Sequence, residues 1–124
     1  MTRHWTVAEA NAALPQVRRI VGDLLAARER ILEARPEIWP VLEKAIGNGG
    51  SRKAGDLILE FERVQRAADQ IRALGIFLKD INTGLIDFLS RREGRDVFLC
   101  WQYDEPAVEH WHDIEDGFGG RQPL

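Results

Sequence analysis

Two long stretches of the chain carry apolar side chains at alternating steps of three and four residues, the spacing that gathers them on one side of an α-helix. In the first stretch the stripe consists of Leu14, Val17, Val21, Leu24 and Ile31. In the second it consists of Leu57, Phe61, Val64, Ala68 and Ile71. Because the stripes share one period, we expect an antiparallel helical hairpin over residues 6–75. The segment that joins the helices, residues 36–52, predicts a short helix from Pro36 to Ala45 and a flexible loop over 47–52.

Local signals mark the ends of the two long helices. Thr6 and Glu9 have the spacing of a capping box, so the first helix is predicted to begin directly after Thr6. Pro15 predicts either a kink or a division of this helix, because proline lacks the amide hydrogen that the helical ladder needs. Gly75 is predicted to end the second helix in a left-handed cap.

After the second helix the pattern changes to short apolar runs separated by turn residues, which is typical of β-strands. The runs span residues 76–79, 85–90 and 96–103. Their spacing predicts a three-stranded antiparallel β-meander. Pro106 is then predicted to open a short C-terminal helix that ends at Gly117. The expected fold class is α+β, a single domain over residues 1–124 in which the hairpin packs with the meander and the C-terminal helix of residues 76–124.

The charge of the chain narrows the classes of partner. The formal net charge is −3, but residues 1–74 hold 12 basic and 10 acidic side chains, whereas residues 75–124 hold 5 and 10. Binding to nucleic acid needs a concentrated cationic face, so nucleic acid is not expected as the main partner. The apolar runs are too short to span a bilayer and no signal peptide is evident, so no membrane is expected either. The single cysteine, Cys100, favours a reducing compartment and a cytoplasmic location.

Four polar side chains share one face of the expected C-terminal helix. They follow one another at steps of four, three and four residues, as Glu105, Glu109, His112 and Asp116. A carboxylate and an imidazole three residues apart on a helix can hold a divalent metal, and this donor set suits zinc, iron or manganese. The competing interpretation is a solvated polar face opposite an apolar stripe. Helical-bundle metal sites, moreover, use a second Glu-x-x-His pair that this chain does not offer.

Cys100 is a second candidate for chemistry. It could act as a nucleophile with His110 or His112, but its place in an apolar strand favours a small buried core residue whose thiol pKa is raised. The sequence contains no phosphate-binding loop, dinucleotide fingerprint, zinc-ribbon spacing or serine-nucleophile motif. Nothing else in the pattern therefore points to a particular reaction.

Three segments of the chain resemble one family. They are residues 6–15, read as TVAEANAALP, residues 79–88, read as KDINTGLIDF, and a C-terminal string with Leu99-Cys100-Trp101, Glu105-Pro106, Trp111-His112 and Gly117 to Leu124. Together they resemble a bacterial family catalogued as domain of unknown function 2203, some of whose members are labelled division-initiation-like. The resemblance implies a small prokaryotic protein without an established activity.

Two functions from different classes remain open at this point. The first is a non-enzymatic interaction module that forms a homo-oligomer through the helical hairpin, because one partner helix cannot cover stripes this wide. The second is a divalent-metal-binding protein or metal-dependent enzyme that uses the polar face of the C-terminal helix. Elemental analysis and light scattering discriminate the two.

Overall fold

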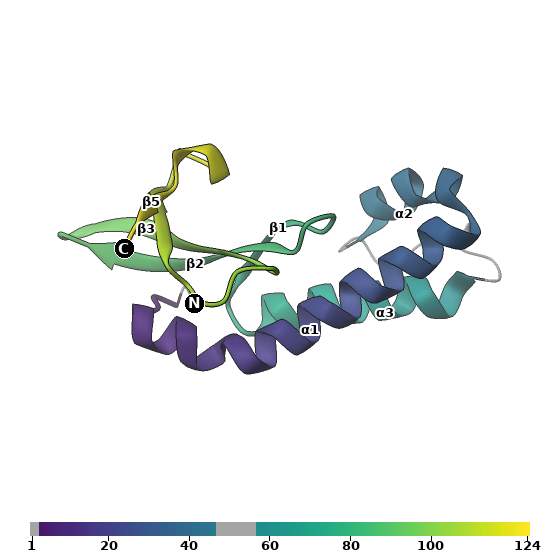
Figure 1. Ribbon diagram of the computed structural model, residues 1–124, viewed down its shortest axis with the longest axis horizontal. Coiled ribbons are helices and arrows are strands. Elements are labelled where there is room, and N and C mark those ends of the chain that lie inside the picture. The colour runs from purple at the N-terminus through teal and green to yellow at the C-terminus, as the bar shows by residue number, and fades with distance from the viewer. Residues whose placement is uncertain (1–2, 47–56) are drawn as a thin grey trace.

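The computed structural model describes residues 3–46 and 57–124, and in it a layer of helices packs against one side of an antiparallel sheet (Figure 1). The helical layer consists of α1 (Val7–Ala34), the short 3₁₀ helix η1 (Pro36–Ile38), α2 (Trp39–Ala45) and α3 (Ile58–Ala73). The sheet consists of β1 (Phe77–Asp80), β2 (Leu85–Arg92), β3 (Arg95–Gln102), β4 (His110–Asp113) and β5 (Gln122–Pro123), with the 3₁₀ helix η3 (Phe118–Gly120) before the last strand. The α+β class is as predicted. None of the helices in the described ranges has the length and apolar content needed to cross a membrane.

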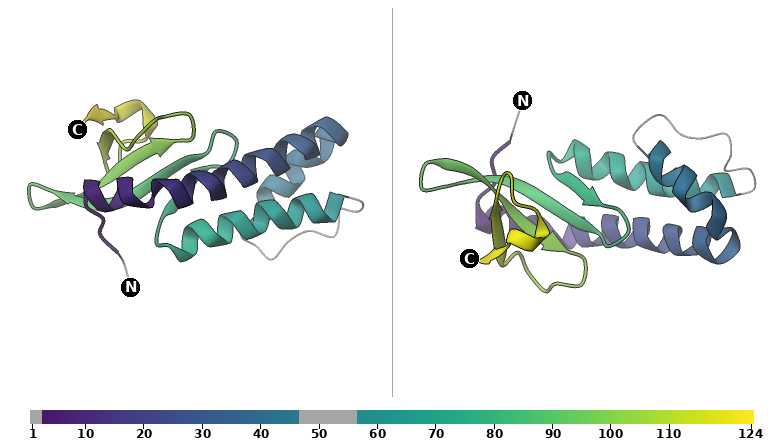
Figure 2. Two further views of the ribbon diagram at one scale, coloured as in Figure 1. Left: turned by 60° about the horizontal axis from the view of Figure 1, so that its bottom comes forward. Right: turned by 90° about the horizontal axis from the view of Figure 1, so that it is seen from above.

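The helical hairpin forms as predicted, with α1 and α3 side by side and antiparallel (Figure 2). The Glu9 amide donates to the Thr6 hydroxyl at 3.1 Å and the Thr6 amide donates to the Glu9 carboxylate at 2.8 Å, which completes the capping box. α1 runs without interruption through Pro15, so the alternative of two separate helices is wrong. Gly75 follows α3 with φ of 81°, the predicted left-handed conformation. The predicted flexible loop, 47–52, lies outside the described residues.

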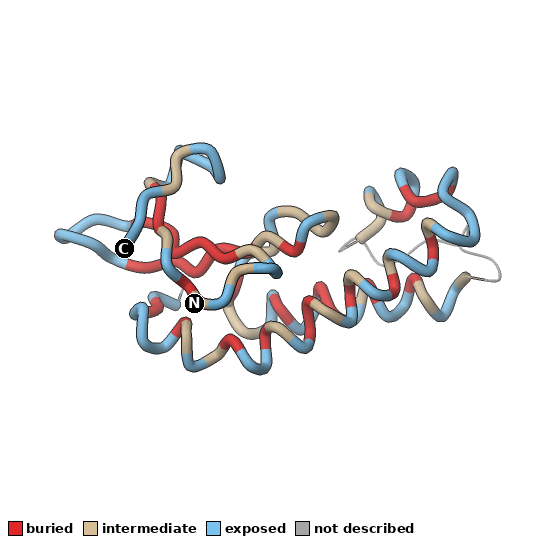
Figure 3. The backbone as a smooth tube through the Cα atoms, in the orientation of Figure 1, coloured by how far each residue is buried: buried red, intermediate tan, exposed pale blue. Residues whose placement is uncertain are grey.

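The apolar stripes of both long helices are buried within the single chain, as the tube in Figure 3 shows along the inner side of α1. The buried positions of α1 include Leu14, Val17, Val21, Leu24 and Ile31, and those of α3 include Phe61, Val64, Ala68 and Ile71. Side chains of the sheet belong to the same core, so each apolar stripe is covered by the sheet as well as by the other helix. The width of the stripes therefore does not by itself require a second copy of the chain.

The sheet is a continuous antiparallel meander in the order β1-β2-β3-β4-β5, and its first three strands are the three predicted from the sequence. Glu93 and Gly94 connect β2 to β3 with φ of 55° and 80°, as a two-residue type I′ hairpin turn requires. Gly84 ends the turn between β1 and β2 with φ of 72°. A Cβ at Gly84 would lie only 2.8 Å from the Val21 side chain, so glycine lets this turn pack directly on α1.

The predicted C-terminal helix is wrong. The segment after Pro106 instead forms a loop, then β4, then η3 and β5, so the sheet has five strands rather than three. Two side chains of α1 secure the loop: Asn11 accepts from the Val108 amide at 2.8 Å, and Arg18 donates to the Glu105 and Pro106 carbonyls at 3.2 Å each. The physical reason for the error is that β3 offers an unpaired edge, and pairing with it outweighs a weak helical pattern only a few turns long.

Alternation along the strands divides the sheet into two faces. The face toward the helices carries Ile86, Phe88, Leu99, Trp101 and Trp111, which all belong to the apolar core. The opposite face carries Asp87, Leu89, Phe98, Cys100 and His112, each at most 8 % exposed. In Figure 1 the segment containing η3 and β5 rises on this second side, away from α1. Both faces of the central strands are therefore shielded from water, but by different parts of the chain.

Candidate functional site

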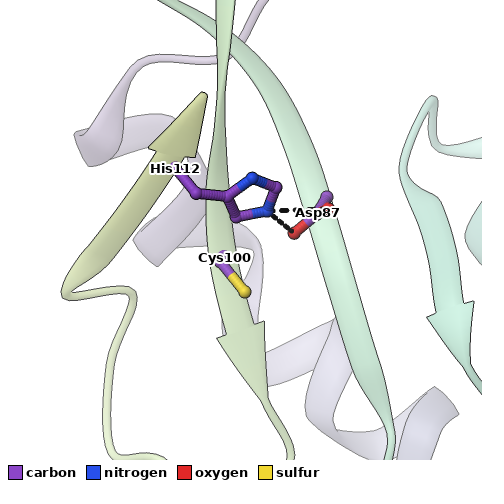
Figure 4. A group of neighbouring side chains, drawn as sticks. All are labelled: Asp87, Cys100 and His112. Atoms are coloured by element: carbon purple, nitrogen blue, oxygen red, sulfur yellow. Dashed lines mark hydrogen bonds and ion pairs between the residues drawn. The ribbon is translucent and has the colours of Figure 1, made fainter. Parts of the chain in front are cut away.

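The candidate site consists of Asp87, Cys100 and His112, one residue from each of the neighbouring strands β2, β3 and β4 (Figure 4). The register pairs Asp87 with Cys100 directly, and it pairs His112 with Phe98, two residues before Cys100. Residues that are paired, or two apart, in an antiparallel sheet point to the same face, so the three side chains converge away from the helices. The sheet register alone thus assembles the group.

The ligand atoms of these side chains, a carboxylate oxygen, a thiol sulfur and an imidazole nitrogen, all lie within 4.8 Å of one another. Asp87 is 2 % exposed, Cys100 0 % and His112 3 %. Within the part of the chain that the structure describes, this is the one group of three or more such residues close enough to hold a metal ion. A polar cluster buried to this extent is costly unless its members satisfy one another or a bound ion.

The two ring nitrogens of His112 have different surroundings. Nδ1 lies 2.8 Å from the Asp113 carbonyl oxygen, which can only accept, so Nδ1 carries a proton and donates. Nε2 lies 3.1 Å and 3.2 Å from the two carboxylate oxygens of Asp87. A neutral ring would therefore present its Nε2 lone pair to the carboxylate, an arrangement that either a second proton on the ring or a cation between the groups makes favourable.

Cys100 is not placed as a nucleophile. Burial, followed by the negative charge of Asp87, raises the pKa of its thiol to about 12, so near neutral pH the reactive thiolate is scarce. Both nitrogens of His112 are engaged with other acceptors, so this ring offers no free base to the thiol. The interpretation of Cys100 as a buried residue with a raised pKa agrees with the structure, and its chemistry is that of a ligand rather than of an unassisted nucleophile.

Three of the four residues predicted as metal ligands lie outside this group. Glu109 and Asp116 are exposed, and Glu105 is half-buried in the loop before β4. Only His112 belongs to the cluster, because the helical face on which the four were placed does not form. In a strand, positions an odd number of residues apart point to opposite faces, so the step of three from Glu109 to His112 no longer brings these two side chains together.

Glu105 instead joins a second polar group that secures the C-terminal segment. Nη2 of Arg121 donates to both oxygens of Glu105 at 2.7 Å and lies 2.9 Å from Nδ1 of His110. His110 is the register partner of Cys100, so this group adjoins the first, and the positive charge of Arg121 acts against the rise in the Cys100 pKa. The contact holds the chain end beside the buried cluster.

Sequence reasoning missed Asp87 and the partnership of Cys100 with it. A signal was present, because Asp87 is the one charged residue in the otherwise apolar run of residues 85–89, in a position where both faces of the sheet are covered. Such a residue is almost always paired. The register that brings Asp87 opposite Cys100, however, depends on the turn between β2 and β3 and could be read only once that turn was known.

The family model described as Uncharacterized conserved protein (DUF2203) matches residues 3–124. No curated protein and no solved structure gives a significant match to the chain. The chemistry of the site therefore has to be argued from its own geometry.

Proposed function

The chain belongs to the DUF2203 family, and from the buried cluster we propose that it binds one divalent transition-metal ion through Asp87, Cys100 and His112. The observation that carries the proposal is the convergence of three different ligand atoms within 4.8 Å of one another, from three strands, in the shielded face of the sheet. One thiol, one imidazole and one carboxylate form a donor set that suits zinc best among the common divalent ions.

The spacing of the donors supports this proposal. Tetrahedral zinc with nitrogen and oxygen ligands at about 2.0–2.1 Å keeps those ligands about 3.3 Å apart. His112 Nε2 and the Asp87 oxygens lie 3.1–3.2 Å apart, so only a small adjustment separates the observed pair from a coordinating one.

The surroundings of His112 support it as well. Histidines that bind metals donate their other ring N–H to a carbonyl or carboxylate, which orients the ring and makes the ligating nitrogen more basic. The Nδ1 bond to the Asp113 carbonyl, at 2.8 Å, has this form and leaves Nε2 toward the cluster. The tautomer that a metal ligand needs is thus the one that the strand already imposes.

The charge balance favours a dication. Once Cys100 has lost its proton, the cluster holds a thiolate and a carboxylate, and a divalent ion neutralises both in a place where unpaired charge is costly. Three protein ligands leave a fourth tetrahedral position for water or a small molecule. We therefore propose a metal site whose fourth coordination position is open to water or a small molecule.

The first test is elemental analysis of the untagged protein, followed by titration of the metal-free protein with cobalt(II). We expect about one equivalent of metal per chain, with a sulfur-to-cobalt charge-transfer absorption that reports a thiolate ligand. Cys100→Ser should remove that absorption, and Asp87→Asn and His112→Gln should weaken binding by at least about tenfold. His4→Gln is the matched control, because His4 is exposed and, among the described residues, its ring pairs with Asp96 rather than with the cluster.

Two results would contradict metal binding at this cluster. One is a wild-type protein that takes up no zinc or cobalt beyond that bound by the Cys100→Ser variant. The other is a wild-type protein that binds one equivalent of cobalt without a sulfur-to-cobalt charge-transfer band, which would mean that Cys100, the single cysteine, is not a ligand. A loss of uptake in His4→Gln that equals the loss in His112→Gln would point to a surface site.

Self-association through the helical hairpin is our second proposal. It is supported by apolar side chains that stay exposed on the hairpin: Val41 in α2 and Ile58 and Leu59 at the start of α3, which are 41 %, 40 % and 63 % exposed. Light scattering at micromolar concentration tests it, and Leu59→Ser should shift the protein toward monomer. A wild-type protein that is monomeric over that range contradicts the proposal.

A further inference from the structure

A cavity of about 370 Å³ opens beside the β1 edge of the sheet, on the strand whose Phe77 is the register partner of Asp87. It lies between the N-terminal arm, the end of α3 and β1, and it is lined by Arg3, Arg72, Gly75, Ile76, Phe77, Leu78 and Lys79. Its size is at the lower end of the range of small-molecule sites. Gly75 adjoins the arm, and a Cβ at this position would lie at an ordinary contact distance, 3.5 Å, from the Arg3 side chain.

The polar side chains that line this cavity are all cationic. Among the described residues that form its wall none carries a carboxylate, although the chain as a whole has a net charge of −3. The carboxylates nearest to two of the cations are loosely placed: Glu9 lies 4.0 Å from Arg3, and Asp69 lies 3.8 Å from Arg72. Ion pairs this long between exposed side chains contribute little. The three cationic side chains therefore remain available to pair with the negative charge of a ligand.

Aromatic rings hold two of these cations in place. The guanidinium carbon of Arg3 lies 3.5 Å from the centre of the Trp5 ring, and Nζ of Lys79 lies 4.8 Å from the centre of the Phe98 ring. A guanidinium stacked on a ring keeps its N–H edge free, and that edge matches a carboxylate or phosphate. Stacking thus orients the donors before any ligand arrives, which lowers the cost of ordering them.

The remaining wall is apolar. Phe77 is 43 % exposed, and Leu78 and the buried Ile76 complete the apolar part of the lining. Arg72 and Lys79 also border a neighbouring cavity whose lining includes Glu43 and Asp80, so acidic residues limit the cationic surface on that side. In the first cavity the cationic and apolar parts meet with no acidic residue among the described lining residues.

We propose that this cavity binds a small organic anion, with a carboxylate or phosphate head group on Arg3, Arg72 and Lys79 and a compact apolar body against Phe77 and Leu78. The proposal is independent of metal binding, because none of the three cluster residues lines the cavity. The expected ligand carries one or two negative charges at one end and, at the other, an apolar group small enough for a cavity of about 370 Å³.

The test follows backbone amide signals by NMR while phenyl phosphate, benzoate, inorganic phosphate or benzyl alcohol is added. We expect phenyl phosphate and benzoate to shift the amide signals of Gly75 and Phe77 in a saturable manner, with a Kd on the order of 1 mM or tighter. Inorganic phosphate should bind at least about tenfold more weakly because it lacks an apolar body, and benzyl alcohol should not saturate because it lacks the charge.

Matched variants separate this cavity from general surface charge. Arg72→Gln with Lys79→Gln should weaken the binding of phenyl phosphate by at least about tenfold, because each lost charge-assisted hydrogen bond is worth roughly a factor of ten or more. Arg66→Gln is the control, since Arg66 is an exposed arginine on the same helix that lines a different cavity. The control should bind as the wild type does.

Several outcomes would overturn the proposal. They are no saturable shift with either organic anion, shifts centred away from Gly75 and Phe77, equal binding of benzyl alcohol, equal binding of inorganic phosphate, and equal losses in the Arg66→Gln control. Unchanged binding in the double variant would overturn it as well. A dispersed amide spectrum of the double variant would exclude unfolding, and if the double variant does unfold, Lys79→Gln alone takes its place in the test.

Discussion

The two faces of the sheet are shielded to a similar extent but filled with different chemistry. Phe88 and Trp101 on the helix side are 0 % exposed, and Asp87 and Cys100, their neighbours in sequence on the other side, are 2 % and 0 % exposed. The first face is covered by long apolar helices and the second by short, polar segments of the C-terminal third. One pair of strands thus serves as packing surface on one side and as a scaffold for polar groups on the other.

The two faces are stabilised by different interactions. The helix side depends on apolar area removed from water and on tight packing, neither of which depends on pH or metal. The opposite side depends on mutual satisfaction of charged and polar groups, which changes when a proton or an ion is added. Substitutions at adjacent positions of β2 should therefore respond to different conditions.

The largest expected effect is on the helix side. Phe88→Ala should lower the free energy of unfolding by about 3–5 kcal/mol, through lost transfer energy and the cavity left beside Trp5. Chemical denaturation measures this, and the loss should be the same with and without zinc. Phe77→Ala is the control because Phe77 is 43 % exposed. A similar loss in both variants would mean that burial does not distinguish the two positions.

The next effect is on the polar side. Asp87→Asn should lower the free energy of unfolding by about 1.5–3 kcal/mol, because it replaces a charge-assisted partner of the buried His112 ring. Zinc at a hundred times the wild-type Kd should stabilise the wild type by about 2.7 kcal/mol and the variant, whose affinity is at least about tenfold lower, by no more than about 1.4 kcal/mol. Thermal unfolding with and without zinc measures both quantities. An Asp87→Asn protein that zinc stabilises as strongly as it does the wild type would argue against Asp87 as a ligand.

The pH dependence of metal binding gives a further test of the polar face, because binding at Cys100 requires the loss of a proton. Burial and the charge of Asp87 raise the pKa of the Cys100 thiol to about 12, so the metal-free thiol keeps its proton through the neutral range. The metal-bound sulfur is deprotonated, and binding therefore releases this proton. Raising the pH should increase the association constant about tenfold per unit, or about 1.4 kcal/mol. Competition with a chelator at several pH values measures the slope, and a flat profile excludes a thiolate ligand.

A smaller effect is expected where α1 secures the loop before β4. Asn11→Ala removes two hydrogen bonds to the Val108 backbone and should cost about 1–3 kcal/mol of stability, because the buried amide loses its acceptor. Hydrogen exchange at the Val108 amide should quicken in the variant while exchange in α3 keeps its wild-type rate. Equal acceleration in both regions would indicate global destabilisation rather than loss of a local anchor.

The smallest effects are expected at the exposed acids predicted from the sequence as ligands. Glu109→Gln and Asp116→Asn should each change the free energy of unfolding by no more than about 0.5 kcal/mol and leave the amount of bound metal as in the wild type. Elemental analysis beside a denaturation curve measures both. A loss of bound metal in either variant would restore the exposed acids as ligands.

How far the sequence predicts this protein depends on the length of each pattern. The stripes of α1 and α3 repeat over many turns, and the capping box and Gly75 mark their ends, so the hairpin is predictable from local physics. From Pro106 to Gly117 the pattern is short enough to fit a helix or a strand. Pairing with the edge of β3 and the contacts of Asn11 and Arg18 favour the strand over the helix. These tertiary interactions cannot be seen in a helical wheel.

The candidate site was predictable only in part for the same reason. His112 was singled out with Glu109 by their spacing on an expected helix that does not form, so only its residue type as a metal ligand carries over. Its partners Asp87 and Cys100 depend on the register of β2 with β3 and on the existence of β4. A shift of one residue in either pairing would send a partner to the opposite face, so the identity of the ligand set is a property of the sheet rather than of a motif.

The order of the strands has a consequence for how the chain folds. In a meander that follows the sequence, each strand pairs with its predecessor, so loops close locally and the sheet can form by successive addition of hairpins within the time range of fast-folding domains. The β2–β3 hairpin brings together two members of the cluster, and the third arrives only when β4 is added. A metal ion would then bind after the folding transition state and stabilise only the native protein. Kinetic measurements should therefore find that metal lowers the unfolding rate and leaves the folding rate unchanged.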